Sequence, residues 1–317
     1  MMFDVACVGI IVADNVLRTV RKVPDQGKLE LVDELQLFSG GCAVNAGIDL
    51  AKIGMNVAVI GKVGQDGYGS FLLDEMRKAG VNVDSVVSDG KTTTSSSAVL
   101  ISENGERSFF HCLGANAEFT EQDVDYSVIE NSKIVFVAGT MLMPKFDGEP
   151  CAKMLKKAQQ CGKITVLDTA WDSTGRWMDV LAPCMPYIDL FIPSLEEAVQ
   201  LSGESEPEKI ADKFLCMGVK TCVIKLGSKG CFIKDSATGF TCTLPTYEKI
   251  KPVDSNGAGD SFCAGFLAGL AQGWSLEKSG RFANAVGTHC ILSAGASTGI
   301  KPMKTILEFM ENYNAQE

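Results

Sequence analysis

The chain has 317 residues, of which 46% are hydrophobic and 21% charged, as expected for a globular protein with a sizeable core. Its net charge is −10, from 29 basic and 39 acidic residues, and the sequence contains no basic run. Because proteins that follow nucleic-acid phosphates normally carry a basic stripe, nucleic-acid binding is disfavoured.

The first part of the chain combines a buried strand, a two-faced segment and two helices. Residues 3–12 are apolar and predict a buried strand, and residues 28–37 mostly alternate apolar with polar side chains, as in a strand with one wet face. Gly40 and Gly41 then break the chain. The next expected elements are a helix over 42–53, a strand over 57–61 and a helix over 70–79.

The middle of the chain begins with a hairpin and continues with alternating strands and helices. Residues 92–101 and 107–112 are strand-like, and Asn104-Gly105 between them is a strong hairpin signal. Alternation from about residue 130 onward favours a parallel sheet with helices on both faces. We expect strands at 134–138, 164–168 and 190–192, helices at 149–161 and 195–202, and a second hairpin at 221–226 and 230–234.

These patterns predict an α/β fold, a doubly wound and mostly parallel sheet with helices on both faces and a small β-sheet lid. The body comprises residues 1–12, 39–91 and 115–317, and the lid comprises residues 13–38 and 92–114. The alternative is that the lid segments are extra edge strands of the main sheet. Because an exposed, half-apolar sheet favours pairing, we also expect a homodimer through the lid.

The cysteines and the N-terminal sequence indicate the cellular compartment of the protein. The 12 cysteines form no C-x-x-C pair, and Cys7, Cys263 and Cys290 lie in apolar stretches, which favours buried free thiols in a reducing cytosol over zinc or disulfides. The N-terminus lacks the basic region and cleavage site of a signal peptide, and no apolar run approaches the roughly 20 residues of a membrane span. We therefore expect a cytoplasmic protein without a membrane partner.

The most informative motif is Asp254-Ser-Asn-Gly-Ala-Gly-Asp-Ser-Phe262. Phe262, Phe266 and Leu270 recur at helical spacing, so the glycines lie where a helix begins. The unpaired N–H groups there favour an anion, and Asp260 in the first turn is positioned to accept a hydroxyl proton. The alternative is structural, with Asp260 supporting the helix dipole and the glycines forming a turn.

Two motifs together resemble one family. Asp254-Ser-Asn-Gly-Ala-Gly-Asp260 resembles the D-T-x-G-A-G-D signature of the ribokinase-like, or PfkB, carbohydrate kinases. Gly40-Gly-Cys-Ala-Val-Asn45, followed by Gly61-Lys-Val-Gly-Gln-Asp-Gly-Tyr-Gly69, resembles the N-terminal signature of that family. Both signatures stand in the family's order, and the resemblance covers essentially the whole chain.

The resemblance implies roles for the residues around Asp260. Asp260 is the expected catalytic base, and the backbone of Asn256, Gly257, Ala258 and Gly259 is the expected anion hole. Substrate contacts are expected from Asp14, Gly40, Gly41, Asn45 and Asp260.

The resemblance also implies ATP, Mg²⁺ and K⁺ as cofactors. Nucleotide contacts are expected from Lys225, Gly227, Ser228 and Gly230 of a K-L-G-x-x-G loop, and from Gly259, Asn284 and Ser194. Glu197 is expected to bind Mg²⁺ through water, while Ser194 departs from the asparagine usual in the family's N-x-x-E pattern. Monovalent-cation contacts, mostly from backbone, are expected at Asp254, Asn256, Cys290, Ser293, Gly295 and Gly299.

Absent motifs exclude several other classes. The sequence has no G-x-x-x-x-G-K-[ST] P-loop, no protein-kinase motif set, and no G-x-G-x-x-G after the first expected strand. Its only histidines are His111 and His289, so a Ser-His-Asp hydrolase has few candidates. For His289 a packing role is favoured, whereas His111 would face substrate if its strand lines the lid.

The sequence and the resemblance together predict a sugar kinase that transfers the γ-phosphoryl group of ATP to a hydroxyl of a free sugar, ribose- or fructose-like. A free sugar is favoured because no Lys or Arg marks a phosphosugar pocket. One alternative is a nucleoside kinase of the same fold, in which Phe109 and Phe110 would stack on the base. Another is a catalytically silent sugar-sensing protein, which Ser194 leaves open and the intact Asp260 opposes.

Overall fold

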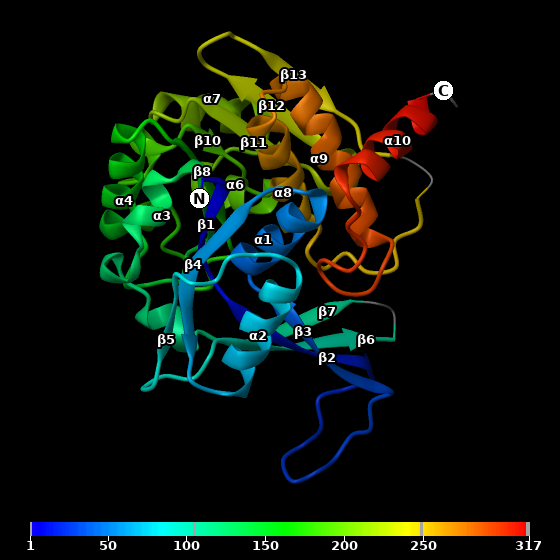
Figure 1. Cartoon of the computed structure of the whole chain (residues 1–317). Coiled ribbons are helices and arrows are strands. Elements are labelled where there is room, and N and C mark those ends of the chain that lie inside the picture. The colour runs from blue at the N-terminus through cyan, green and yellow to red at the C-terminus, as the bar shows by residue number, and fades with distance from the viewer. Residues whose placement is uncertain (1, 104–105, 248–249, 315–317) are drawn as a thin grey trace.

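The computed structural model describes residues 2–103, 106–247 and 250–314, and its body is built on one large sheet (Figure 1). Its strands pair in parallel, except for the last two at one edge, which pair antiparallel. In spatial order they are β13 (Thr241–Leu244), β12 (Cys231–Asp235), β11 (Thr221–Lys225), β10 (Leu190–Phe191), β9 (Ile164–Thr169), β8 (Ser132–Thr140), β1 (Phe3–Gly9), β4 (Val57–Gly64) and β5 (Val86–Asp89).

Helices cover both faces of this sheet, so its central strands are buried on both sides. In β1, Val5 and Cys7 face one core, and Ala6 and Val8 face the other. The first core includes α1 (Cys42–Ile53), α2 (Gly67–Lys78), α8 (Ala258–Ala271), α9 (Leu276–Ile291) and α10 (Met303–Asn314). The second includes α3 (Tyr126–Glu130), α4 (Glu149–Gln160), α5 (Met178–Leu181), α6 (Leu195–Ser202) and α7 (Pro207–Cys216).

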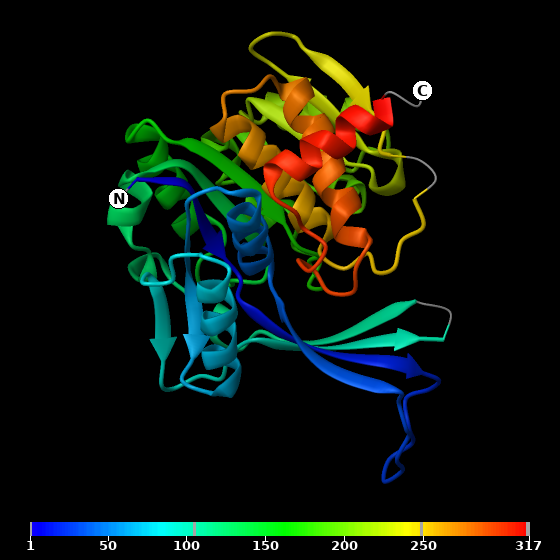
Figure 2. The same ribbon diagram turned by 45° about the vertical axis from the view of Figure 1, so that its right-hand side comes forward.

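A second sheet of four strands projects from the body beneath the segment that leads to α8 (Figure 2). We call it the lid sheet. Its order is β3 (Glu34–Gly40), β2 (Val12–Val20), β6 (Ser96–Ser102) and β7 (Arg107–Cys112), with β2 and β6 parallel and the other pairs antiparallel. Because successive side chains of a strand alternate between faces, Asp14, Val16 and Arg18 share one face, the inner face.

The structure confirms the predicted fold, with a mostly parallel sheet, helices on both faces and a small second sheet. The helices expected at 42–53 and 195–202 have those bounds, and Cys7, Cys263 and Cys290 are buried. All twelve cysteines lie within the described residues, and each is a free thiol.

Two strand predictions near the N-terminus were wrong. The apolar run 3–12 is two strands, because the chain leaves the main sheet after Gly9 and enters the lid sheet at Val12 while staying buried. Residues 28–33 are not a strand, because the pairing of β2 with β3 ends at Arg18 and Glu34. β6 and β7 pair as the predicted hairpin, although Asn104 and Gly105 at its turn lie outside the described residues.

Across the part of the chain that the structure describes, no helix has the length and apolarity required to cross a bilayer.

Candidate active site

Asp260 lies in the first turn of α8, directly after Ala258 and Gly259, which line a cavity. The helix is preceded by Gly257, whose φ of 75° lies in the left-handed region. A Cβ at Gly257 would lie 2.5 Å from Cβ of Ala296, so only glycine fits there. The first turn of a helix has N–H groups without intrahelical partners, and here those groups lie beside a cavity.

The structure brings Asp260 together with Asn45 of α1. Nδ2 of Asn45 donates a hydrogen bond of 2.8 Å to Oδ2 of Asp260. Asn45 is 4% exposed, and its Oδ1 has no hydrogen-bond partner among the described residues. Since a buried acceptor without a donor costs free energy, this oxygen is suited to accept a hydrogen bond from a ligand hydroxyl.

The environment of Asp260 makes its carboxylate a stronger base than usual. Burial raises the pKa of Asp260, and the hydrogen bond from Asn45, the charge of Lys225 and a hydrogen bond from the Cys42 thiol oppose that rise only in part. A carboxylate that holds a proton more tightly is better suited to general-base catalysis near neutral pH.

Asp14, Gly40 and Gly41 meet where the lid sheet joins the body. A Cβ at Gly40 would lie 2.2 Å from Oδ2 of Asp14, so the missing side chain leaves room for that carboxylate. Gly41 has a φ of 89°, and a Cβ there would lie 2.5 Å from the carbonyl oxygen of Ile10. The pKa of Asp14 is raised to about 6, chiefly by burial and also by the charge of Asp260, while a hydrogen bond from Ser97 opposes the rise. Four predicted substrate residues therefore gather near Asp260.

Lys225, at the end of β11, places a permanent positive charge beside the start of α8. Its Nζ lies 2.8 and 2.7 Å from the two carboxylate oxygens of Asp168, whose side chain is 2% exposed. Burial acts to lower the pKa of Lys225, but the Asp168 carboxylate raises it well above its usual value. A Cβ at Gly259 would lie 3.5 Å from Nζ of Lys225, so this ammonium group is near the expected anion hole.

Asp168 was not predicted as a site residue. It lies near the carboxyl end of β9, where ligands of open α/β sheets usually bind, and that position was the available signal. Its pairing with Lys225, 57 residues away, depends on the tertiary arrangement of β9, β10 and β11.

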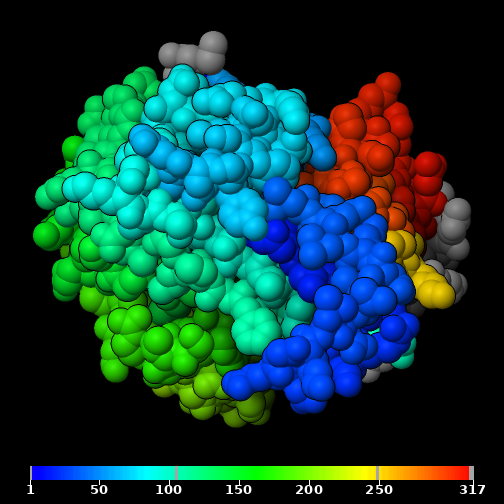
Figure 3. Space-filling model, turned by 90° about the horizontal axis from the view of Figure 1, so that it is seen from below, coloured from blue at the N-terminus to red at the C-terminus, as the bar shows by residue number. Residues whose placement is uncertain are grey.

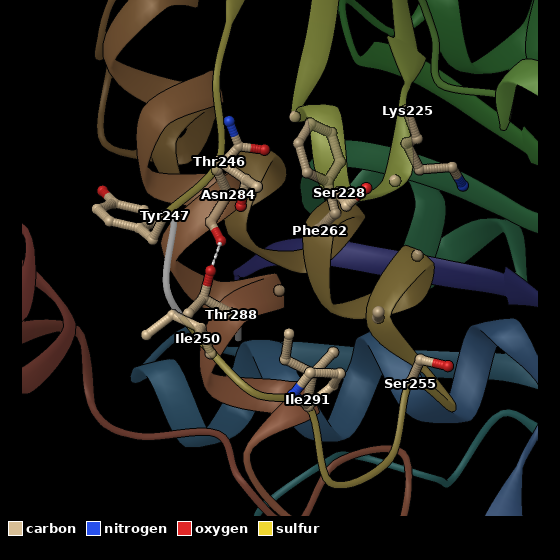
Figure 4. A pocket seen from close by; sticks show the side chains of 16 residues that line it. Lys225, Ser228, Thr246, Tyr247, Ile250, Ser255, Phe262, Asn284, Thr288 and Ile291 are labelled. Atoms are coloured by element: carbon tan, nitrogen blue, oxygen red, sulfur yellow. Dashed lines mark hydrogen bonds between the residues drawn. The ribbon is translucent and has the colours of Figure 1, made fainter. Parts of the chain in front are cut away.

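A cavity of about 500 Å³ lies between α8, α9 and the β11–β12 turn (Figure 4). Its wall is mostly apolar, with small residues at the helix ends, which suits a flat heterocycle joined to phosphates. Nδ2 of Asn284 donates hydrogen bonds of 3.3 and 3.1 Å to the carbonyl oxygens of Leu244 and Pro245, fixing the segment before Thr246. The lining residues are Lys225, Gly227, Ser228, Gly230, Thr246, Tyr247, Ile250, Pro252, Ser255, Ala258, Gly259, Phe262, Asn284, Gly287, Thr288 and Ile291.

Six of the seven predicted nucleotide residues line this cavity, and Ser194 does not. Ser194 caps α6 instead, since its Oγ accepts from the backbone N–H of Glu197 at 3.3 Å. Oε2 of Glu197 accepts from the N–H of Ser194 and from Oγ1 of Thr169, both at 3.0 Å. Within the described residues Oε1 of Glu197 makes no hydrogen bond, so it is available to a metal-bound water.

The residues predicted to hold a monovalent cation form one cluster. Oδ1 of Asp254 accepts from the N–H of Asn256 at 2.9 Å, and Oδ2 accepts from the N–H of Gly295 at 3.1 Å. The thiol of Cys290 lies 3.3 Å from the carbonyl oxygen of Asn256, and the N–H of Ser293 donates to the carbonyl of Cys290 at 3.3 Å. A Cβ at Gly299 would lie 3.1 Å from that carbonyl oxygen.

The two histidines have different surroundings. His289 packs its ring against Phe309 with centroids 5.0 Å apart, in agreement with the packing role favoured for it. His111 pairs with Ser97 across the lid sheet, and its Nδ1 lies 3.1 Å from Oγ of Ser97. His111 therefore lies on the inner face with Asp14, and its contact with substrate stays a prediction.

Comparisons with known proteins identify the family. Residues 2–303 match the model of the pfkB family of carbohydrate kinases. The 5-dehydro-2-deoxygluconokinase of Clostridium perfringens is 25% identical over 98% of this chain and 93% of its own length, and the probable fructokinase-5 of Arabidopsis thaliana is 28% identical over 86% and 89%. The ribokinase of Thermotoga maritima superimposes with a TM-score of 0.85 at 25% identity, covering 98% of this chain and 100% of that one. The chain therefore belongs to the pfkB family of carbohydrate kinases and is a sugar kinase, a phosphotransferase with an alcohol group as acceptor.

Proposed function

We propose that this sugar kinase transfers the γ-phosphoryl group of ATP to a hydroxyl of a free sugar, ribose- or fructose-like, with Asp260 as the general base. The hydrogen bond between Asn45 and Asp260 carries the proposal. It joins the polar groups around Asp14 to the first turn of α8, which borders the 500 Å³ cavity. A sugar hydroxyl beside Asp260 would thus face a phosphate at the start of that helix.

In the transfer step, residues of this chain accept the proton of the sugar hydroxyl and stabilise the negative charge on the phosphoryl group. A carboxylate oxygen of Asp260 takes the proton of the sugar hydroxyl as the hydroxyl oxygen forms a bond to the γ-phosphorus. The bond between that phosphorus and the bridging oxygen breaks, and ADP leaves with the electron pair. The N–H groups around Gly257, Ala258 and Gly259 and the ammonium of Lys225 stabilise the charge on the transferred group.

A neutral polyol suits the groups near Asp260. Asp14 and Oδ1 of Asn45 are acceptors for sugar hydroxyls, and Gly40 leaves space beside Asp14. Curated relatives are named for fructose and for 5-dehydro-2-deoxygluconate, both rich in hydroxyl groups.

The proposal includes ATP, Mg²⁺ and K⁺. Mg²⁺ supplies charge neutralisation between the phosphates when it is bound. Glu197 would hold one of its waters through Oε1, while Ser194 would act by capping α6 and orienting Glu197. Asp254 and the backbone groups of Asn256, Cys290, Ser293, Gly295 and Gly299 would hold K⁺ and keep the anion-hole loop in place.

The proposal also covers the lid, the assembly and the compartment. Residues 13–38 and 92–114 would close over the sugar and exclude water. Leu35 and Phe110, on the outer face of the lid sheet, are 63% and 64% exposed, which supports a homodimer. The free thiols support a cytoplasmic location.

A nucleoside is the second candidate substrate, and Phe109 is the observation in its favour. Phe109 pairs with Val99, the partner of Val16, so it lies on the inner face of the lid sheet with Asp14. It is 56% exposed and free to stack on a base.

A coupled assay of ADP release tests the proposal over ribose, fructose, 5-dehydro-2-deoxygluconate, fructose 6-phosphate and adenosine. We expect ADP release that depends on one of the free sugars. Release with adenosine alone would establish the nucleoside alternative, and turnover of fructose 6-phosphate alone would refute a free-sugar substrate. Sugar binding without turnover, measured by calorimetry, would support a silent sensor.

A further inference from the structure

Two arginines on the inner face of the lid sheet reach across to the segment that leads into α8. Arg18 of β2 pairs with Ile101, and Ile101 pairs with Arg107 of β7, so both arginines lie in one cross-strand row. Nη2 of Arg107 donates a hydrogen bond of 2.7 Å to Oγ of Ser255, and its Nη1 lies 3.8 Å from Oδ1 of Asp254. Nη2 of Arg18 lies 3.6 Å from Oδ2 of Asp254.

These contacts connect the far part of the lid sheet to the body. In Figure 2 the outer ends of β2 and β7 lie beneath the segment that leads to α8, and in Figure 3 blue atoms of the lid abut yellow atoms of the body. Arg18 also contacts Glu34 of the lid, with Nε and Oε2 3.1 Å apart. The guanidinium of Arg18 therefore lies between a lid carboxylate and a body carboxylate.

Asp254 contacts both the lid sheet and the expected anion hole. Its carboxylate accepts hydrogen bonds from the N–H groups of Asn256 and Gly295, and its side chain is 8% exposed. Asn256 is followed directly by Gly257, whose position depends on close packing against Ala296. A buried carboxylate that loses its cationic partner is destabilised. Removing the arginines should therefore destabilise the Asp254 carboxylate in this position and weaken its hydrogen bonds to the loop.

The same lid strand also carries the predicted sugar contact. Asp14 precedes Arg18 by four residues on one strand and one face, a distance of roughly 13 Å along the strand. A sugar held at Asp14 fixes the near end of β2, and the contact of Arg18 with Asp254 fixes its far end. One rigid strand thus connects the sugar side of the site with the phosphate side.

We propose that Arg18 and Arg107 are positioning residues that couple sugar binding under the lid sheet to ordering of the anion-hole loop at Asp254. The proposal rests on the proposed function, because it assigns the sugar to Asp14 and the phosphates to the start of α8. Since coupling between two ligands is reciprocal, the sugar and the nucleotide each raise the affinity of the enzyme for the other.

The variants are Arg18→Gln, Arg107→Gln and the double variant, with Arg21→Gln as the matched control. Arg21 is a lid arginine whose Nε lies 2.9 Å from Oε1 of Glu103, a lid residue. The first measurement is hydrogen exchange of the unliganded proteins, which needs no assumption about the substrate. We expect the N–H groups of Asn256 and Gly295 to exchange several-fold faster in the double variant and at the wild-type rate in Arg21→Gln.

The second measurement is the Kd of Mg²⁺–AMP-PNP by calorimetry, with and without a saturating sugar from the panel. In the wild type we expect the sugar to lower this Kd by a factor within the usual range of roughly 5 to 150, and in the double variant we expect the factor to fall toward 1. Arg21→Gln should keep the wild-type factor. Arg107→Lys, which keeps the positive charge, should have a larger factor than Arg107→Gln.

Several results would overturn the proposal. One is hydrogen exchange at Asn256 and Gly295 that is the same in the double variant as in the wild type. Another is a wild-type nucleotide Kd that the sugar does not change. A third is a double variant in which the sugar lowers the nucleotide Kd by the wild-type factor. Nucleotide binding that Arg107→Gln weakens equally with and without sugar would make Arg107 a plain phosphate ligand and also overturn it. Failure of every sugar to bind would refute the proposed function, while the exchange data would still decide whether the arginines hold the loop.

Discussion

At the scale of single residues, the site places two carboxylates near each other in a largely buried space. Asp14 comes from a lid strand and Asp260 from a body helix, and the charge of Asp260 adds to burial in raising the pKa of Asp14 to about 6. Such an arrangement costs free energy in the empty enzyme and favours ligands whose hydroxyl groups donate hydrogen bonds to both carboxylates.

Replacing Asp14 with Asn should stabilise the protein while impairing sugar binding. The folded-state pKa of about 6 exceeds the unfolded value near 3.8, so the folded state holds the proton more tightly. Its free energy of unfolding therefore falls as the pH rises from about 4 to 6 and stays lower above that. At pH 7.5, Asp14→Asn should raise this free energy by roughly 1–3 kcal/mol, and the gain should shrink at pH 5.

Urea unfolding at pH 7.5 and pH 5 measures the gain in the free energy of unfolding. The value of kcat/KM for the sugar measures the loss in sugar binding. An Asp14→Asn variant that is less stable than the wild type at pH 7.5 would show that the buried carboxylate of Asp14 does not destabilise the folded state. The wild-type kcat/KM should also fall as the pH drops below 6, because protonated Asp14 loses acceptor capacity.

The two signature motifs led to the predictions for Asp260, Asn45 and the glycines near them, because each motif is a short continuous stretch of sequence at the start of a helix. They were insufficient for Asp168, Arg18 and Arg107, whose partners are 57 to 236 residues away in sequence. Ionic pairs of this kind depend on which strands become neighbours, which a single sequence does not specify locally.

At the scale of elements, the start of α8 depends on one glycine. Gly257→Ala would combine a left-handed φ of 75° with a Cβ 2.5 Å from Cβ of Ala296. We expect a loss of more than about 1–2 kcal/mol in the free energy of unfolding, and a clear fall in kcat because the anion hole shifts. Urea unfolding and steady-state kinetics measure the two effects.

Gly273, just beyond the end of α8, provides the matched control. It has a similar φ of 72°, but a Cβ there would meet nothing within 4 Å. Gly273→Ala should cost only about 1 kcal/mol and leave kcat unchanged. If the two variants had equal kcat, the role of Gly257 in the anion hole would be wrong.

The errors in strand prediction have a physical cause at the same scale. Residues 28–33 continue an alternating pattern, but a strand needs a hydrogen-bonded partner, and the pairing of β2 with β3 stops at Arg18. The apolar run from Phe3 continues through the junction of body and lid, so composition alone did not mark the change of sheet. The helices over 42–53 and 195–202 were predictable, because glycines end both and a capping box begins the second.

At the scale of the whole molecule, the outer face of the lid sheet is the expected dimer contact. Phe110 lies on that face, whereas its neighbour Phe109 lies on the inner face. In gel filtration with light scattering, we expect the wild type at twice the 33.9 kDa of one chain and Phe110→Asp at the mass of one chain. Phe109→Asp, the control on the opposite face, should keep the dimer mass, and a monomeric wild type would contradict the assignment.

Asp260 is the proposed base of the transfer reaction, and the Asp260→Asn variant is the decisive test of that role. Removing a general base typically costs a factor of about 10² to 10⁴, so kcat should fall by that factor while the Kd for Mg²⁺–AMP-PNP stays within about twofold of wild type. Asp74→Asn, an exposed site whose carboxylate contacts Arg77 at 3.4 Å, should retain full activity as the control. A near-normal kcat in Asp260→Asn would show that another group takes the proton and that Asp260 is not the base.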